Sequence, residues 1–445
     1  MVKRLDDRRI RLTAELRDRI FRPLPADKRI SWLWALAITL LGGVLRFAHL
    51  TRPAGDGKAQ IFDEIYYVHD SWTLLHHGYE LDTTNTFGAF VAHPPLGKWC
   101  IALGEALFGE NPFGWRCAAA VAGTLAILAL IRIARRMFRS TLLGCIAGLL
   151  LALDGLELVQ SRAALLDIFL MTFLLAAFGC LVLDRDHRRR TTLAALQDGT
   201  ATAHRLPGRT LASVPWWRFA AGVFTGMALG VKWSAVYYIV AYVLLVLAWE
   251  YGVRRSAGVR RPFRDTLLGE TGWLAAFVGF ALLAYLATWT GWFATSGGYD
   301  RGYYAAGHDG HPLPPVINAL YNLGRYHYES CSSTRISTCR TNTSRGRGAG
   351  CCSAAQSRTR IPRLARAGPA TSARPRRSRW APRRSGGPSS RPCWSAAGSG
   401  SPAGTGAQPP PSSARPPGSC RGSPSRIERC SISTPSPHCP FWCWR

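Results

Sequence analysis

Two adjacent carboxylates, Asp63 and Glu64, lie within a short apolar and aromatic stretch at residues 61–67. A carboxylate held in such surroundings loses part of its hydration, and this raises its pKa toward the range that suits a general base. An acidic pair on a solvated loop has the same spacing and is the ordinary alternative. These residues alone leave both interpretations open, and the sequence does not choose which of the two carboxylates would be the base.

Three basic residues, Arg116, Arg162 and Lys232, lie at the ends of long apolar runs. A charge within a membrane span costs about 2.5–3.5 kcal/mol on insertion scales, so such groups usually pair or line a polar cavity. The alternative is that each side chain snorkels toward the headgroups and pairs there. Because these basic residues and the acidic pair converge at one membrane face, we predict that together they form a polar site at the outer leaflet.

Two further residues support this set. His93 is followed by two prolines, which fix an extended turn, and a purely structural hydrogen bond is its alternative role. Asp167 lies five residues after Arg162, and we interpret it as a partner that orients a cation rather than as a catalyst. The sequence contains no spacing of His, Cys or acidic residues that is typical of a metal site, so we expect no metal.

Membrane helices must hold these residues in place. The chain has 445 residues, 47% of them hydrophobic, and its apolar residues gather in long runs before residue 300. About 20 apolar residues span a bilayer, and these runs lack the regular polar face of a soluble helical bundle. We predict an all-α multi-span membrane protein with seven spans, at residues 31–50, 113–133, 141–159, 163–183, 215–231, 233–250 and 272–293.

Basic residues accumulate on one side of these spans. Residues 1–30 contain ten Lys and Arg, and the linkers after the second, fourth and sixth spans are also rich in Arg. Cytoplasmic segments carry this excess of positive charge. We therefore predict a cytoplasmic basic head at 1–30 and an outer loop at 51–112, on the outer face of the plasma membrane. Within the loop, residues 98–110 are predicted to form a helix that lies in the interface.

The last part of the chain, residues 331–445, has a different composition. It contains 20 Arg and a single acidic residue, Glu428, and few large apolar residues. Such a segment cannot offset the entropy of folding, so we predict that it is disordered. A nucleic-acid-binding arm would normally mix Lys with Arg, and no Lys occurs here. The composition matches a GC-rich gene read in a shifted frame, so we interpret the tail as a frameshift product and expect no nucleic-acid partner. Residues 31–330 then form the functional domain.

An ordered series of motifs resembles the bacterial branch of the protein O-mannosyltransferases. The series begins with the acidic pair, continues through residues 93–98 (His-Pro-Pro-Leu-Gly-Lys), and covers about residues 30–330. Its later members are Trp115-Arg116, residues 161–167, residues 230–234, residues 289–293, residues 298–301 and Tyr326-His327.

The resemblance implies a GT-C membrane glycosyltransferase fold. It implies transfer of mannose, with inversion, from polyprenyl-phosphate mannose to Ser or Thr hydroxyls of exported proteins. It also implies that the acidic pair engages the acceptor and that Arg116 belongs to the active site. We expect Arg116, Arg162 and Lys232 to bind the donor phosphate, and no cofactor or metal to be needed. Trp233 and Trp292 are expected to stack on the sugar or prenyl chain, or to belong to an interfacial aromatic belt.

Two other functions fit parts of the sequence. A GT-C transferase that acts on lipid or polysaccharide shares the outer acidic loop but is not expected to share the whole motif series. A transporter or flippase predicts charges near mid-membrane and an internal repeat of broken helices, and we find neither in the sequence. The family has more spans than this chain, so we expect a cavity that lacks a wall and leave open that the chain as written is inactive.

Overall fold

The computed structural model of the protein describes residues 14–52, 60–90, 92–199, 206, 214–308, 310–311 and 313–343, the last thirteen by their backbone alone. All of them belong to one compact unit, Met1–Arg360. Within these ranges the regular structure is helical, apart from one isolated β-bridge between Leu81 and Gly88. The predicted all-α class is confirmed.

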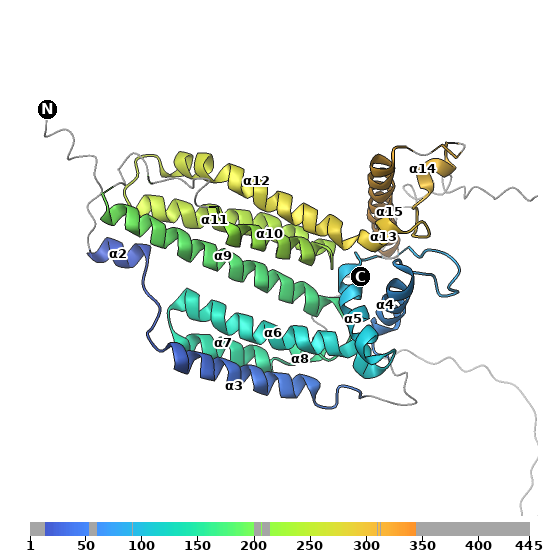
Figure 1. Cartoon of the computed structure of the whole chain (residues 1–445), viewed down its shortest axis with the longest axis horizontal. Coiled ribbons are helices and arrows are strands. Elements are labelled where there is room, and N and C mark those ends of the chain that lie inside the picture. The colour runs from blue at the N-terminus through green and yellow to red at the C-terminus, as the bar shows by residue number, and fades with distance from the viewer. Residues whose placement is uncertain are drawn as a thin grey trace, which may run out of the picture. The chain divides into compact units, whose positions relative to one another are not determined.

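One group consists of three helices that lie side by side in Figure 1, with the long helix α6 (Pro112–Phe138) contacting the other two. Those two are α3 (Lys28–Phe47) and α7 (Thr141–Leu153). Helix α6 begins where it does because the Asn111 side chain accepts hydrogen bonds from the backbone N–H groups of Phe113 and Gly114, both at 3.0 Å. Gly148 of α7 packs against Ile131 of α6, and a Cβ at this position would overlap the Ile131 side chain.

A second group of helices forms the larger hydrophobic core. Its members are α9 (Leu166–Gln197), α10 (Trp216–Leu229), α11 (Val236–Ser256) and α12 (Pro262–Thr288). Helix α9 contacts both α6 and α10 and so joins the two groups (Figure 1). Leu181, Ala221 and Phe277 are buried where α9, α10 and α12 meet.

Within the described residues, five helical segments are long and apolar enough to cross a membrane. They are Lys28–Phe47, Pro112–Phe138, Leu166–Gln197, Trp233–Ser256 and Pro262–Thr288. Two of the seven predicted spans, 141–159 and 215–231, correspond instead to shorter helices. Helix α7 ends at Leu153 because Asp154 caps the next helix, α8 (Gly155–Gln160), by accepting from the Glu157 N–H. Seven spans are therefore not established, although the protein is a multi-pass membrane protein.

Short helices gather at one end of these long helices (Figure 1). They are α4 (Glu64–His77), α5 (Leu96–Phe108), α13 (Thr290–Ala294) and α14 (Tyr303–Ala306), together with the longer α15 (Pro315–Thr343). Helix α5 is the predicted interfacial helix, although its position relative to a bilayer stays a prediction. Helix α15 continues beyond the boundary predicted near residue 330, while the rest of the predicted tail, 344–445, lies outside the described residues.

The opposite end of the second group is held by buried ion pairs. Arg218 of α10 pairs with Asp184 of α9 at 2.9 Å and with Glu270 of α12 at 2.6 Å. Arg254 of α11 pairs with Glu250 at 3.0 Å and with Glu270 at 3.4 Å. Because each side chain is almost fully buried, these ion pairs fix four helices relative to one another.

Candidate active site

Glu64, the first residue of α4, forms a buried bidentate ion pair with Arg116 of α6. Arg116 Nε donates to Glu64 Oε1 and Nη2 to Oε2, both at 2.7 Å, and both side chains are 0% exposed. The carboxylate also accepts from the backbone N–H groups of Ile61, at 2.9 Å, and Ala164, at 2.7 Å. Glu64 therefore ties the start of α4 to α6 and to the segment before α9.

Asp63 is the neighbouring carboxylate and has a different environment. It is partly exposed, and within the described part of the chain its one side-chain hydrogen bond is a long one, from the Tyr67 hydroxyl to Oδ2 at 3.5 Å. Burial raises the pKa of Tyr67, and the negative charges of Asp63 and Asp167 raise it further. In the described part of the chain, Asp63 forms no salt bridge, so its carboxylate stays open to an approaching hydroxyl group.

Lys232 forms a salt bridge with Asp167, the second residue of α9. Its Nζ lies 2.7 Å from Asp167 Oδ1, and the two side chains are 20% and 49% exposed. Lys232 follows the end of α10, where the Leu96 N–H donates to the Gly230 carbonyl at 2.9 Å. This bond holds the turn that carries Lys232 against the start of α5.

His93 completes this group of side chains. Its ring lies 6.3 Å from that of Tyr67, measured between centroids. Burial, together with the positive charges of Lys232 and Lys98, lowers the pKa of His93 to about 4. His93 is therefore neutral near pH 7 and able both to donate and to accept a hydrogen bond. We call the five residues Asp63, Tyr67, His93, Asp167 and Lys232 the carboxylate–lysine cluster.

The structure places two predicted site residues away from this cluster. Arg162 Nη2 donates to the carbonyl oxygens of Ala48 and His49, at 2.8 and 3.3 Å, after the end of α3. Arg116 is buried beneath the cluster and is engaged by Glu64 and by the carbonyls of Leu50 and Arg52.

The two predicted aromatic residues have internal partners. Trp233 Nε1 donates to the Tyr285 hydroxyl at 3.0 Å, and its ring lies 5.3 Å from that of His327. Trp292 is 4% exposed, and its Nε1 donates to the Tyr299 carbonyl at 3.0 Å. Both contacts are structural, and stacking on a ligand stays a prediction.

Two residues of the region were not singled out by the sequence. Tyr67 lies one helical turn after Asp63, and this four-residue spacing was the available signal. Lys98 is 1% exposed and lies 2.7 Å from Glu80 and 3.5 Å from Asp70. The sequence feature that could have identified Lys98 is a cation within a short apolar helix. Through Asp70, Lys98 holds α4 against α5 and so helps to position Asp63.

Comparison with known proteins identifies relatives of this chain. Residues 92–199 match the family described as dolichyl-phosphate-mannose-protein mannosyltransferase. The chain is 39% identical over 307 residues to the polyprenol-phosphate-mannose–protein mannosyltransferase of Mycolicibacterium smegmatis, covering 68% of this chain and 58% of that protein. It is 39% identical over 315 residues to the protein of the same name from Mycobacterium tuberculosis, covering 69% and 59%. The chain thus spans rather more than half the length of these relatives.

A weaker likeness is to a solved structure, the archaeal oligosaccharyltransferase AglB from Archaeoglobus fulgidus. The TM-score is 0.40 at 16% sequence identity, with 71% of this chain and 39% of that chain covered.

The apolar helices and the polar cluster at their ends thus define a multi-pass membrane protein related to membrane glycosyltransferases. Residues 92–199 carry the match to the dolichyl-phosphate-mannose-protein mannosyltransferase family, and the resemblance stated from the motifs is confirmed by that match and by the relatives of the same name.

Proposed function

We propose that this protein transfers mannose, with inversion, from polyprenyl-phosphate mannose to Ser or Thr hydroxyls of exported polypeptides at the outer face of the plasma membrane. The family match and the relatives support the reaction class. One observation within the site carries the proposal: Asp63 forms no salt bridge in the described part of the chain, yet it belongs to a cluster that contains a cation, Lys232.

In the proposed reaction, Asp63 accepts the proton of the acceptor hydroxyl while the hydroxyl oxygen bonds to the anomeric carbon. The bond from that carbon to the phosphate oxygen breaks, and its electron pair leaves with the prenyl phosphate. Attack and departure occur on opposite faces of the sugar, so the configuration inverts. The proton ends on Asp63 and the negative charge on the phosphate.

Lys232 is the cation that we assign to the departing phosphate. Its ammonium group is one-fifth exposed and is held by Asp167, whose own carboxylate is half-exposed. A preoriented cation of this kind stabilises the charge that develops on a leaving oxygen. We assign the orienting role predicted for Asp167 to its contact with Lys232, whereas Arg162, which contacts the carbonyls of Ala48 and His49 instead, stays a prediction for the donor phosphate.

Glu64 and Arg116 act on this reaction through position. Their ion pair fixes the first turn of α4, and Asp63 immediately precedes that turn. We therefore propose that Asp63 is the base and that the Glu64–Arg116 ion pair fixes its position. In this proposal Arg116 does not contact the phosphate directly.

Membranes that contain the full chain provide the test. They are incubated with polyprenyl-phosphate mannose labelled in the sugar and with a Ser/Thr-containing acceptor peptide, and the label is then located by mass spectrometry. We expect mannose on the peptide hydroxyls. A peptide with Ala in place of every Ser and Thr is the matched control and is expected to stay unlabelled. Label that appears on lipid or glycan, or no transfer at all, would contradict the proposal for this chain.

A further inference from the structure

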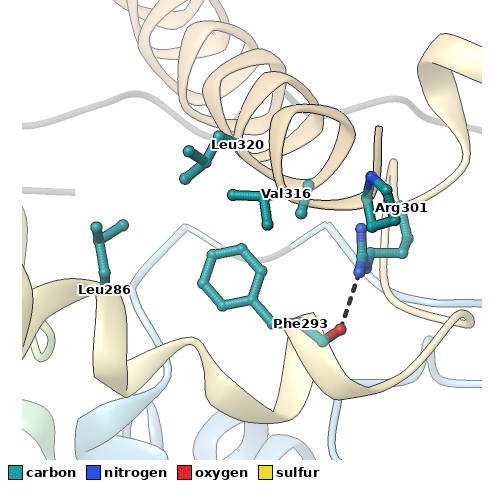
Figure 2. Close-up of a pocket in the computed structure, with 7 residues that line it drawn as sticks. Leu286, Phe293, Arg301, Val316 and Leu320 are labelled. Carbon is teal, nitrogen blue, oxygen red and sulfur yellow. Dashed lines mark hydrogen bonds between the residues drawn. The ribbon is translucent and has the colours of Figure 1, made fainter. Parts of the chain in front are cut away.

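Two adjoining cavities lie where the end of α12, helix α13 and the start of α15 meet. The first has a volume of about 410 Å³ and is lined largely by apolar side chains, among them Leu286, Phe293 and Leu320. Figure 2 shows these three side chains, together with Val316, directed toward one space. The second, of about 440 Å³, shares Phe293 and Arg301 with the first. Each volume is in the range of small-molecule sites, about 300–1,000 Å³.

The apolar cavity lies at the end of a helix long enough to span the membrane. Leu286 belongs to the last turn of α12, and the preceding residues Leu282 and Leu283 are 49% and 64% exposed. Val316 and Leu320 of α15 are 71% and 48% exposed. Apolar side chains this open, beside the end of a membrane helix, are suited to contact with hydrocarbon chains.

The second cavity is polar, and Arg301 lies at its boundary with the first. Arg301 Nε donates to the carbonyls of Trp292 and Thr295, and Nη2 to that of Phe293 at 2.8 Å (Figure 2). These neutral acceptors orient the guanidinium group without cancelling its charge. Among the described residues, no carboxylate forms a salt bridge with Arg301, and Nη1 has no hydrogen-bond partner. The same cavity is lined by Ser296 and Asn318.

We propose that this double cavity binds an anionic glycerophospholipid of the bilayer. An acyl chain lies along Leu286, Val316 and Leu320, and the phosphodiester accepts a hydrogen bond from Arg301 Nη1. A phosphodiester carries one negative charge, which matches a single available guanidinium. A phosphate monoester, which approaches two charges, would call for further cations that the described lining lacks.

The proposed lipid site is separate from the carboxylate–lysine cluster. Tyr285 precedes Leu286 in α12, and its hydroxyl contacts Trp233 and His327 on another face of the helix. Successive residues of a helix point about 100° apart, so Leu286 faces the cavity while Tyr285 faces the core. The proposal does not depend on mannosyl transfer.

Lipid retention in native mass spectrometry tests the site. The full chain is delipidated in a neutral detergent and then offered phosphatidylglycerol, phosphatidylcholine, farnesyl phosphate or inorganic phosphate. We expect phosphatidylglycerol to be retained about tenfold better than phosphatidylcholine. Both contain a phosphodiester, but the trimethylammonium group of phosphatidylcholine cancels the net negative charge that the Arg301 guanidinium attracts. Inorganic phosphate is expected to leave no adduct because it has no chain for the apolar cavity.

Four variants locate the adduct. Leu320→Trp fills the apolar cavity, and Arg301→Gln removes the charge; each should lower phosphatidylglycerol retention about tenfold. Leu268→Trp and Arg264→Gln change exposed residues of the same types near the other end of α12 and should leave retention unchanged. Because Arg301→Gln also removes carbonyl contacts and risks misfolding, Leu320→Trp, which leaves those contacts intact, decides the result in that case.

Three outcomes would overturn the proposal. One is equal retention of the two phospholipids, and another is a phosphatidylglycerol adduct that persists in Leu320→Trp. The third is a preference for farnesyl phosphate that is lost in Lys232→Met and kept in Leu320→Trp, which would move the lipid to the carboxylate–lysine cluster. None of these outcomes depends on whether mannose is transferred.

Discussion

Asp63 and Glu64 are neighbours in the chain, yet they have opposite environments. Glu64 is fully buried, and its two oxygens accept four hydrogen bonds from Arg116, Ile61 and Ala164. Asp63 is partly exposed and has one long contact with Tyr67. Adjacent positions at the start of a helix point in different directions, so one carboxylate supports the fold while the other stays accessible. This difference separates the effects that substitutions of the two residues should have.

Asp63→Asn should lower mannose transfer by about 10²- to 10⁴-fold, the usual contribution of a general base. The melting temperature should change little because Asp63 forms no salt bridge in the described part of the chain. Transfer rates at saturating donor and the melting temperature in detergent are the two measurements. Glu110→Gln, an exposed carboxylate next to α5, is the matched control. Transfer by Asp63→Asn at the control rate would exclude Asp63 as the base.

Glu64→Gln should instead destabilise the protein. The change leaves the Arg116 guanidinium buried opposite an uncharged amide, and breaking a buried pair in this way costs about 3–5 kcal/mol. We expect a clear fall in melting temperature and a loss of activity that follows the loss of folded protein. If the Glu64→Gln variant had the melting temperature of the parent protein but a lower turnover, Glu64 would have a direct catalytic role.

At the scale of elements, the contact between α4 and α5 determines where Asp63 lies. Lys98 of α5 binds Asp70 of α4 and Glu80. Further along the same contact, Glu105 of α5 is 1% exposed and accepts from the Ser71 hydroxyl at 2.8 Å through Oε2, while Oε1 has no hydrogen-bond partner. Burial, with a smaller contribution from the charge of Glu110, raises the pKa of Glu105 to about 7.

This pKa predicts how the stability of the α4–α5 contact depends on pH. Because the folded-state pKa lies above the ordinary value of 4.5, the contribution of Glu105 is fully present below pH 4.5 and is lost as the pH rises through 7. Glu105→Gln keeps an acceptor for Ser71 and carries no charge. At pH 8.5 it should therefore be more stable than the parent by roughly 1–3 kcal/mol.

Chemical denaturation in detergent at pH 5 and pH 8.5 measures this effect. Near pH 5 the difference between Glu105→Gln and the parent should be small. Asp18→Asn, an exposed carboxylate of α2 (Ala14–Ile20), is the control and should show no such pH dependence. An advantage of Glu105→Gln that is the same at both pH values would mean that ionisation of Glu105 does not set the stability of this contact.

At the scale of the whole described unit, charge differs between the two ends of the long helices. The end near α4 and α5 carries the carboxylate–lysine cluster, and the other end carries ion pairs built around Arg218 and Arg254. Basic residues favour the cytoplasmic side. This distribution supports the proposal that the cluster faces outward.

Cysteine labelling in intact cells tests that orientation. Thr83→Cys lies in an exposed turn after α4 and should react with a membrane-impermeant maleimide added from outside. Ser256→Cys, exposed at the end of α11, should react only after permeabilisation. Both signals are read above that of the parent chain, which already contains 13 cysteines. The reverse pattern would place the cluster on the cytoplasmic side.

The sequence by itself determined the class of the protein and the region of its site. Apolar runs of membrane length predict helices whatever their neighbours, because each helix satisfies its own backbone hydrogen bonds. The motif series predicted a resemblance to one family, and the family match at residues 92–199 and the relatives confirm that resemblance. Two predicted spans form shorter helices, because Asp154 caps a new helix within one apolar stretch and α10 ends at Leu229, before the turn that carries Lys232.

Only the tertiary structure decided which charged groups are partners. Glu64 and Arg116 are 52 positions apart in the chain, and Asp167 and Lys232 are 65 apart, so no local pattern links them. The packing of α4 on α5 and of α5 on α6 brings Glu64 to Arg116, and the packing of α9 on α10 brings Asp167 to Lys232. That packing distinguishes two carboxylates that the sequence could not resolve, one buried in an ion pair and one accessible, because burial and pairing depend on neighbours that are distant along the chain.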